Sequence, residues 1–224
     1  VPGLQVVEMS ATPTAASSQT EIRLDGDDLE RDPELRNRLA SPKPVSVEAT
    51  PGLSAKGATA EAVRHIVERA RKLRRELPTA PDGLSNTVGI VVNRVDTAIR
   101  VAAALDKLEG PEHVACWVGR MRPIDVDRQR GERPGLFEIQ GHQDTHYLVS
   151  TQTIEVGLDL DLAGMVTELA PGSAIAQRLG RVNRLGRRER AEAIVLVPEQ
   201  GIVEDLPPYD SVELESAADW LHEV

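Results

Sequence analysis

LVSTQTIEVGLDLDLAGMVTELAPGSAIAQRLGRVNRLGR, residues 148–187, is the stretch of this 224-residue chain around which the other predicted elements are arranged. Two short apolar runs, HYLVS (146–150) and GMVTELA (164–170), predict strands. Pro171 and Gly172 end the second strand, and Ser173 is placed to cap a helix over SAIAQRLGRVNR (173–184). Two strands followed by a helix indicate an α/β arrangement.

The predicted helix 173–184 has one apolar and one polar face. At about 100° per residue its aliphatic side chains share one stripe, and Gln177, Arg181 and Arg184 share the opposite one. Two guanidinium groups on a rigid element suit a phosphate, because their geometry matches its oxygens and they stay protonated. Gly180 lies inside this predicted helix, where glycine costs about 1 kcal/mol relative to alanine and often marks a close contact. A surface helix with merely solvated arginines is the alternative.

Strand and helix patterns alternate through the rest of the chain. NTVGIVVN (86–93) is a near-continuous apolar run, typical of a parallel strand that is covered on both faces. Further strands are predicted at 43–49, 113–119 and 191–198, and helices with an apolar stripe at 60–77 and 97–109. Such alternation predicts a parallel sheet with helices on both faces.

Composition limits the class of protein. The residues are 40% hydrophobic but only 2% aromatic, so the core must be aliphatic. The single cysteine, Cys116, excludes an internal disulfide and a cysteine-based zinc site, and the five histidines lack metal-ligand spacing, so no metal is expected. There is no signal peptide and no apolar run that could span a bilayer, which predicts a soluble cytoplasmic protein without a membrane partner.

The net charge of −10 argues against a polyanionic partner, but the charge is unevenly distributed. Residues 178–190 contain six arginines and one glutamate, and residues 120–133 form a second basic stretch. A local basic groove on an acidic body is therefore compatible with the sequence.

The ordered motifs carry a family resemblance. TQTIEVGLD (151–159) followed by APGSAIAQRLGRVNRLGR (170–187) resembles motifs V and VI of superfamily 2 helicases. The TQ pair at a strand end, with Glu155 three residues on, and QRxGRxxR after a proline-containing turn are similar to the CRISPR-associated type I helicase-nuclease family. Many members have a small polar residue at the position of Gly157. SAT (10–12) resembles motif III, and the strand that ends at Asn93 resembles motif IV.

The resemblance implies an α/β RecA-like fold and a role as the C-terminal motor lobe. It implies that Arg181, Arg184 and Gln177 act in catalysis at an ATP site between two lobes. Gly157 and Asp159 would line the nucleotide.

The resemblance also implies which residues bind the nucleic acid and which residues couple the two lobes. Asn93, Thr151 and Gln152 would face the nucleic-acid backbone, together with Arg120 and Arg122 of a basic loop. The residues implied for coupling between the lobes are Ser10, Ala11, Thr12 and Glu155.

The predicted organisation is that of one lobe with flanking pieces. We expect residues 1–14 to end a first lobe, 15–44 to link the lobes with a short helix at 32–39, 45–200 to form the second lobe, and 201–224 to begin an accessory region. The sequence contains no GxxxxGK[ST] loop and no acidic Mg²⁺-binding motif before SAT, so the first lobe must supply both. We therefore expect this fragment alone to be inactive.

The function implied by the resemblance is an ATP-driven translocase on single-stranded DNA in CRISPR antiviral defence. The implied partners are the first lobe, an HD-type nuclease domain and an RNA-guided surveillance complex. Two alternatives remain. One is another superfamily 2 enzyme such as an RNA helicase, in which motif VI commonly begins with His instead of Gln177. The other is a non-catalytic nucleic-acid or partner-binding module that has kept the lobe without the motor.

Overall fold

The computed structural model describes residues 26–54, 56–119 and 121–223. The predicted coupling residues Ser10, Ala11 and Thr12 lie outside the described residues, as does Arg120. Within the described part of the chain, no helix is both long and apolar enough to cross a bilayer.

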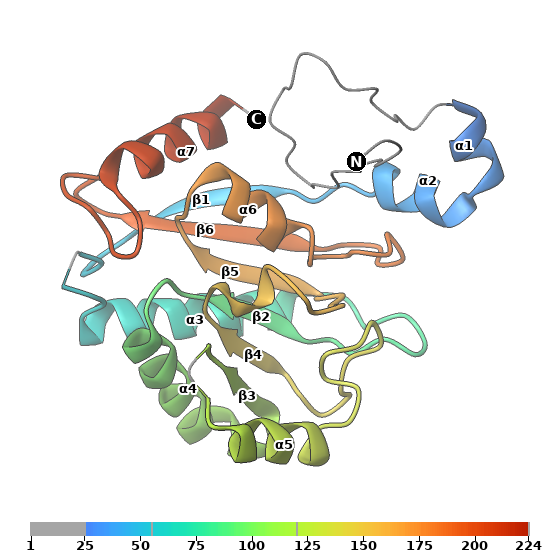
Figure 1. Cartoon of the computed structure of the whole chain (residues 1–224), viewed down its shortest axis with the longest axis horizontal. Helices are drawn as coiled ribbons and strands as arrows, with labels where there is room; N and C mark the ends of the chain where they lie inside the picture. The colour runs from blue at the N-terminus through green and yellow to red at the C-terminus, as the bar shows by residue number, and fades with distance from the viewer. Residues whose placement is uncertain (1–25, 55, 120, 224) are drawn as a thin grey trace, which may run out of the picture.

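The fold is built on one six-stranded sheet in which every pair of neighbouring strands is parallel (Figure 1). The strands are β1 Val45–Thr50, β2 Val88–Val91, β3 Val114–Trp117, β4 Tyr147–Ser150, β5 Gly164–Glu168 and β6 Glu192–Pro198. Their order across the sheet is β1-β6-β5-β2-β4-β3. The central strand β2 is buried at all four positions, as its continuous apolar sequence predicts. The predicted α/β RecA-like fold with a parallel sheet is confirmed.

Helices cover both faces of the sheet. Because successive strand residues point to opposite faces, each face offers apolar side chains against which helices pack. The helices are α1 Gly26–Arg31, α2 Pro33–Ala40, α3 Ala60–Glu76, α4 Val95–Glu109, α5 Pro123–Glu132, α6 Gly172–Leu179 and α7 Ser211–Glu223, with 3₁₀ turns η1 Pro111–His113 and η2 Gln152–Ile154. Ile90 of β2 and Ile194 of β6 pack with the buried stripes of α3 and α4. Val195 of β6 faces the other side, where it packs with α6 and α7.

The fit between helix and sheet is close at Gly164, the first residue of β5. A Cβ atom there would lie 3.0 Å from Leu73 of α3 and 3.1 Å from the carbonyl oxygen of Glu192 on β6. A glycine thus lets α3 lie directly on the sheet. The predicted apolar stripe of this helix is buried, and Thr59 caps its first turn by accepting a hydrogen bond from the Ala62 amide.

The predicted helix 173–184 is wrong at both ends. The structure begins α6 at Gly172, with Pro171 at the cap instead of Ser173, and ends it at Leu179. Gly180 is therefore the C-cap and not a residue inside the helix.

The chain leaves the helix because it pairs with a distant segment. Leu162 donates its amide to the Arg181 carbonyl at 2.8 Å, and the Asn183 amide donates to the Leu162 carbonyl at 2.9 Å. Asn183 has a φ of 42°, which turns the backbone away from a helical path. Arg181 and Arg184 consequently do not share a helix face with Gln177. We call residues 180–188 the arginine turn.

Two smaller expectations also change. Helix α4 begins at Val95 with Arg94 at its cap, so Asp96 lies in the first turn and does not precede the helix. The segment after Arg122, expected to be a loop, forms the ten-residue helix α5.

Candidate functional site

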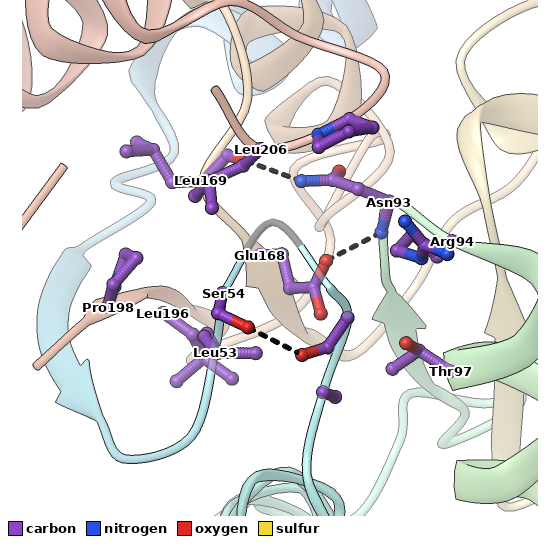
Figure 2. A pocket seen from close by; sticks show the side chains of 13 residues that line it. Leu53, Ser54, Asn93, Arg94, Thr97, Glu168, Leu169, Leu196, Pro198 and Leu206 are labelled. Carbon is purple, nitrogen blue, oxygen red and sulfur yellow. Dashed lines mark hydrogen bonds between the residues drawn. The ribbon is translucent and has the colours of Figure 1, made fainter. Parts of the chain in front are cut away.

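The carboxyl ends of β2 and β5 are joined by a buried polar contact. The Asn93 amide N–H donates to Glu168 Oε2 at 2.7 Å, and the Asn93 side-chain amide donates to the Leu169 carbonyl at 2.8 Å (Figure 2). In parallel sheets this edge is where ligands usually bind. Here it holds a carboxyl group and an amide side by side.

A small pocket with a cavity volume of about 30 Å³ opens beside this contact (Figure 2). Its polar lining includes Asn93, Glu168 and Thr97, and its walls are mostly aliphatic and proline side chains. The Thr97 hydroxyl is buried and has no hydrogen-bond partner within the described residues. Complete burial raises the pKa of Glu168 to about 6, against the opposing effect of the Asn93 hydrogen bond.

Arg178 of α6 is the largest fully buried side chain among the described residues, with no exposed surface. Its guanidinium donates to Glu155 Oε1 at 2.9 Å, to Thr167 Oγ1 at 2.9 Å and to the Glu168 carbonyl at 3.0 Å. It also donates to Asn93 Oδ1 at 3.2 Å. One cation therefore connects α6, β5, the end of β2 and the segment after β4.

The segment after β4 completes this set of contacts. Thr151 is buried, and the Gln152 side chain donates to the Asn93 carbonyl at 3.2 Å. Tyr209, in the segment before α7, accepts a hydrogen bond from Arg178 at 3.3 Å. We call Asn93, Gln152, Glu155, Glu168, Arg178 and Tyr209 the Arg178 network. It brings together three of the predicted functional residues, Asn93, Gln152 and Glu155.

The arginine turn holds the other predicted residues. The Arg181 guanidinium donates to three carbonyl oxygens of one loop, those of Ile154 at 3.1 Å, Glu155 at 2.7 Å and Leu158 at 2.6 Å. Burial lowers the pKa of Arg181, and the nearby Arg184 lowers it further. Arg181 therefore fixes the 154–158 loop on which Gly157 lies.

Arg184 is placed differently. Its guanidinium pairs with the Asp159 carboxylate at 3.1 Å, and about a third of its side chain is exposed. Its backbone N–H donates to Asp161 Oδ1 at 2.7 Å, which fixes the main chain at this position. Gly157 has a φ of 78° and has open space around it. Gly157, Asp159 and Arg184 thus form an accessible polar surface.

Arg188 lies beneath this surface and is buried. It donates to the carbonyl oxygens of Ser85 and Asp161, both at 2.8 Å, and its backbone N–H donates to Asn183 Oδ1 at 3.0 Å. Burial raises the pKa of the neighbouring Asp161, although Arg188 opposes that rise. These contacts hold the arginine turn in one conformation.

Comparisons with known proteins lead to one family. The family described as "CRISPR-associated nuclease/helicase Cas3, C-terminal" matches residues 85–187. This span contains the Arg178 network without Tyr209 and the arginine turn without Arg188. This part of the chain thus resembles the C-terminal helicase lobe of Cas3 proteins.

Curated and solved relatives lead to the same family. A putative CRISPR-associated nuclease/helicase Cas3 of Myxococcus xanthus is 34% identical over 137 residues, covering 58% of this chain and 17% of the relative. The Cas3 of Streptococcus thermophilus is 31% identical over 108 residues, covering 46% and 11%. The Cas3-like chain therefore spans less than a fifth of the length of these relatives.

Solved structures support the fold. The T. fusca Cas3 structure with AMPPNP aligns with a TM-score of 0.64 at 22% identity, covering 81% of this chain and 21% of that one. A chain in a CRISPR RNA-guided surveillance complex before nicking aligns with a TM-score of 0.54 at 23% identity, covering 82% and 23%. These likenesses show that this chain shares its fold with part of each of these solved structures.

Two predicted residues of the Cas3-like lobe lie apart from both groups. Gln177 is partly buried on α6 and makes no side-chain hydrogen bond within the described residues. Arg122 caps α5 and pairs with Asp125 at 2.7 Å, with 77% of its side chain exposed. The Arg122 hydrogen bond lowers the pKa of Asp125.

Sequence reasoning missed Arg178, Glu168 and Arg188 as parts of the site. Glu168 carried a usable signal, because a glutamate in the otherwise apolar strand sequence GMVTELA needs a cation when it is buried. The Glu168 carboxylate accepts a hydrogen bond from the Asn93 amide instead of pairing directly with a cation, and the nearby charge of Arg178 opposes the rise in its pKa that burial causes. Among the described residues, no three His, Cys, Asp or Glu side chains gather as a metal site would require.

Proposed function

We propose that this Cas3-like lobe is the second motor lobe of an ATP-dependent helicase that translocates on single-stranded DNA in CRISPR interference. In this proposal Arg184 contacts ATP bound between this lobe and a first lobe. The observation that carries the proposal is the contrast between the fixed main chain of Arg184 and its accessible guanidinium.

The ion pair between Arg184 and Asp159 is suited to exchange. Both side chains are partly exposed, at 34% and 59%, and such pairs contribute only about 0–1 kcal/mol. A γ-phosphate carries more charge and accepts both guanidinium N–H groups. Arg184 can therefore leave Asp159 for a phosphate at little cost, while Asp161 keeps its main chain in place.

Arg181 has a different task in this proposal. Its hydrogen bonds fix the 154–158 loop. They thereby hold Gly157, and Asp159 directly after the loop, in place; these are the two residues proposed to line the nucleotide. Contact with ATP requires Arg181 to release one of these carbonyl oxygens. Gln177, which is partly buried on α6, is proposed as a further catalytic contact.

The proposed DNA-binding residues divide in the same way. Arg122 is exposed and is proposed to contact phosphates directly, together with Arg120. Asn93 and Gln152 are held in the Arg178 network. We therefore propose that they and Thr151 shape the protein main chain at the strand ends, along which the DNA is proposed to pass. Glu155 joins this network to the 154–158 loop, which supports its proposed role in coupling, shared with Ser10, Ala11 and Thr12.

The remaining partners are proposals that rest on the family. The relatives are described as nuclease/helicases, and one similar chain belongs to a surveillance complex. We propose that a first lobe supplies the phosphate-binding loop and holds the Mg²⁺ that accompanies ATP, and that an HD-type nuclease and an RNA-guided surveillance complex are partners in the cytoplasm.

The proposal is tested by replacing Arg184 with alanine in a chain that also contains a first lobe. We expect ATP turnover to fall by about 10³ to 10⁵, as for other arginine fingers, while AMPPNP and DNA still bind. Arg187→Ala is the matched control, because Arg187 is exposed on the same turn. Arg188 is unsuitable as a control because it is buried. Equal loss of turnover in the Arg184 and Arg187 variants would contradict the arginine-finger assignment.

A further inference from the structure

The segment before β1 is attached to the arginine turn. Ser41 donates from its hydroxyl to the Gly186 carbonyl at 3.3 Å and accepts a hydrogen bond from the Asn183 side chain at 3.3 Å. Pro44 accepts a hydrogen bond from the Ala193 amide at 3.0 Å, which ties the segment to β6. Residues 41–44 are thus fixed beside the turn that holds Arg184.

Gly186 shows how closely these segments approach. A Cβ atom at this position would lie 2.3 Å from the carbonyl oxygen of Asn37 in α2, and the φ of Gly186 is 65°. Both the space and the backbone angle require glycine there. The contact between α2 and the arginine turn is therefore built into the sequence.

Lys43 lies within this docked segment, between Pro42 and Pro44. Its side chain is partly buried, and within the described residues it has no hydrogen bond and no ion pair. Burial lowers the pKa of Lys43. The charge of Asp161 raises it and the charge of Arg184 lowers it. Ser41, two residues before Lys43, contacts Asn183 and Gly186 on either side of Arg184, so Lys43 belongs to a segment that is docked beside this second cation.

The environment of Lys43 is open on one side. A groove with a volume of about 390 Å³ is lined by Pro42, Lys43, Pro44, Glu189, Arg190 and Ala191. Arg190 is already paired with Glu192 at 3.0 Å. Glu189 is exposed, so its carboxylate is hydrated. Lys43 is the cation of this groove that has no partner in the described part of the chain.

We propose that Lys43 is a phosphate-binding residue of the proposed nucleotide site, and that its ammonium and the Arg184 guanidinium bind the same polyphosphate. This inference rests on the proposed function and adds to it a second cation from outside the helicase motifs.

Partial desolvation of the Lys43 ammonium favours the binding of an anion. Lys43 has already lost part of its hydration on folding, and the charge of Asp161 compensates for this loss only in part, since the pKa of Lys43 stays lowered. An anion that enters the groove restores a favourable interaction and separates the like charges of Lys43 and Arg184. A lysine ammonium is a compact charge with three donors, which suits phosphate oxygens without demanding one geometry. Because Lys43 belongs to the segment before β1, nucleotide binding would also act on the position of that segment.

Lysine NMR provides a direct test on this chain. Its four lysines are Lys43, Lys56, Lys72 and Lys107. Lys43 alone among them is partly buried, since the other three are exposed or carry mostly exposed side chains. With ¹³C-methylated lysines, inorganic tripolyphosphate should shift the Lys43 resonance selectively and raise its pKa, because an anion favours the charged form. Equal shifts for all four lysines, or none for Lys43, would overturn the inference.

A second measurement uses the chain joined to a first lobe. Lys43→Met should weaken AMPPNP binding about tenfold, as expected for the loss of one charge-assisted contact, whereas Lys43→Arg should retain most of the affinity. Lys107→Met, which removes an exposed lysine on α4, is the control and should leave the affinity unchanged. Unchanged AMPPNP affinity in Lys43→Met, or an equal loss in Lys107→Met, would overturn the inference. If Arg184→Ala still abolishes turnover in that case, the proposed function stands and only the role of Lys43 fails.

Discussion

Arginine side chains have opposite roles in the Arg178 network and in the arginine turn. Arg178 is completely buried and donates to five partners from four parts of the fold. Arg184, six residues later, has one partly exposed ion pair and a fixed main chain. The spacing of the arginines in QRxGRxxR therefore does not reveal which of them are structural. Burial and partners make that distinction.

The largest expected effect on stability is that of Arg178→Ala. Removal of this guanidinium leaves Glu155 and the polar groups around Glu168 without their buried cation, which typically costs about 3–5 kcal/mol. Urea unfolding of this chain measures the loss. Arg187→Ala should change stability by less than about 0.5 kcal/mol, because Arg187 is exposed. A loss below about 1 kcal/mol for Arg178→Ala would contradict the structural role of the Arg178 network.

Arg188→Ala should have the second largest effect. It removes two buried hydrogen bonds to the carbonyls of Ser85 and Asp161 and the nearest cation of the Asp161 carboxylate, 3.8 Å away. We expect a loss of about 2–3 kcal/mol in urea unfolding. Arg190→Ala, two residues on and mostly exposed, is the control. Equal stability of the two variants would show that Arg188 does not hold the arginine turn.

Glu168 gives the Arg178 network a pH dependence. Its pKa of about 6 in the folded chain exceeds the ordinary value of 4.5, so the folded state binds the proton more tightly. Its contribution to stability is therefore complete below pH 4.5 and is lost as the pH rises through 6. The shift corresponds to about 2 kcal/mol.

The variant Glu168→Gln isolates this effect, because glutamine stays neutral. As the pH rises from 4.5 to 7, the wild-type chain should lose about 2 kcal/mol of stability that the variant keeps. Urea unfolding of both proteins at the two pH values measures this difference. If the difference between the two proteins is the same at both pH values, Glu168 does not titrate as its burial indicates.

The smallest expected effect concerns the proposed DNA contact of Arg122. Binding of an oligothymidine should be weak and salt-sensitive, with the slope of log affinity on log salt about 0.7 shallower after Arg122→Ala. Arg64→Ala on α3 serves as the control, since 66% of the Arg64 side chain is exposed and it lies outside the proposed DNA path. An unchanged slope in Arg122→Ala would remove Arg122 from the DNA-binding surface.

The sequence was sufficient where local pattern decides structure. The buried strand at β2 and the apolar stripe of α3 follow from residues that are neighbours along the chain, and the structure has both. The alternation of strands and helices likewise predicted the parallel sheet.

It failed where distant residues compete with local preference. Residues 180–184 continue a helical pattern, but pairing of Val182 with Leu162 ends the helix at Leu179. Arg178 meets Asn93 across 85 positions of sequence, so no spacing argument reveals their contact. The same holds for Ser41 and Asn183, which lie 142 positions apart.

We propose that this lobe carries half of an ATP site and acts only with a first lobe. The most direct test compares ATP turnover by this chain alone with turnover by the chain joined to a first lobe, each with and without single-stranded DNA. We expect no hydrolysis above background for the chain alone and DNA-stimulated hydrolysis for the joined protein. DNA-stimulated hydrolysis by this chain alone, or its absence from a folded two-lobe protein that binds both AMPPNP and DNA, would contradict the claim.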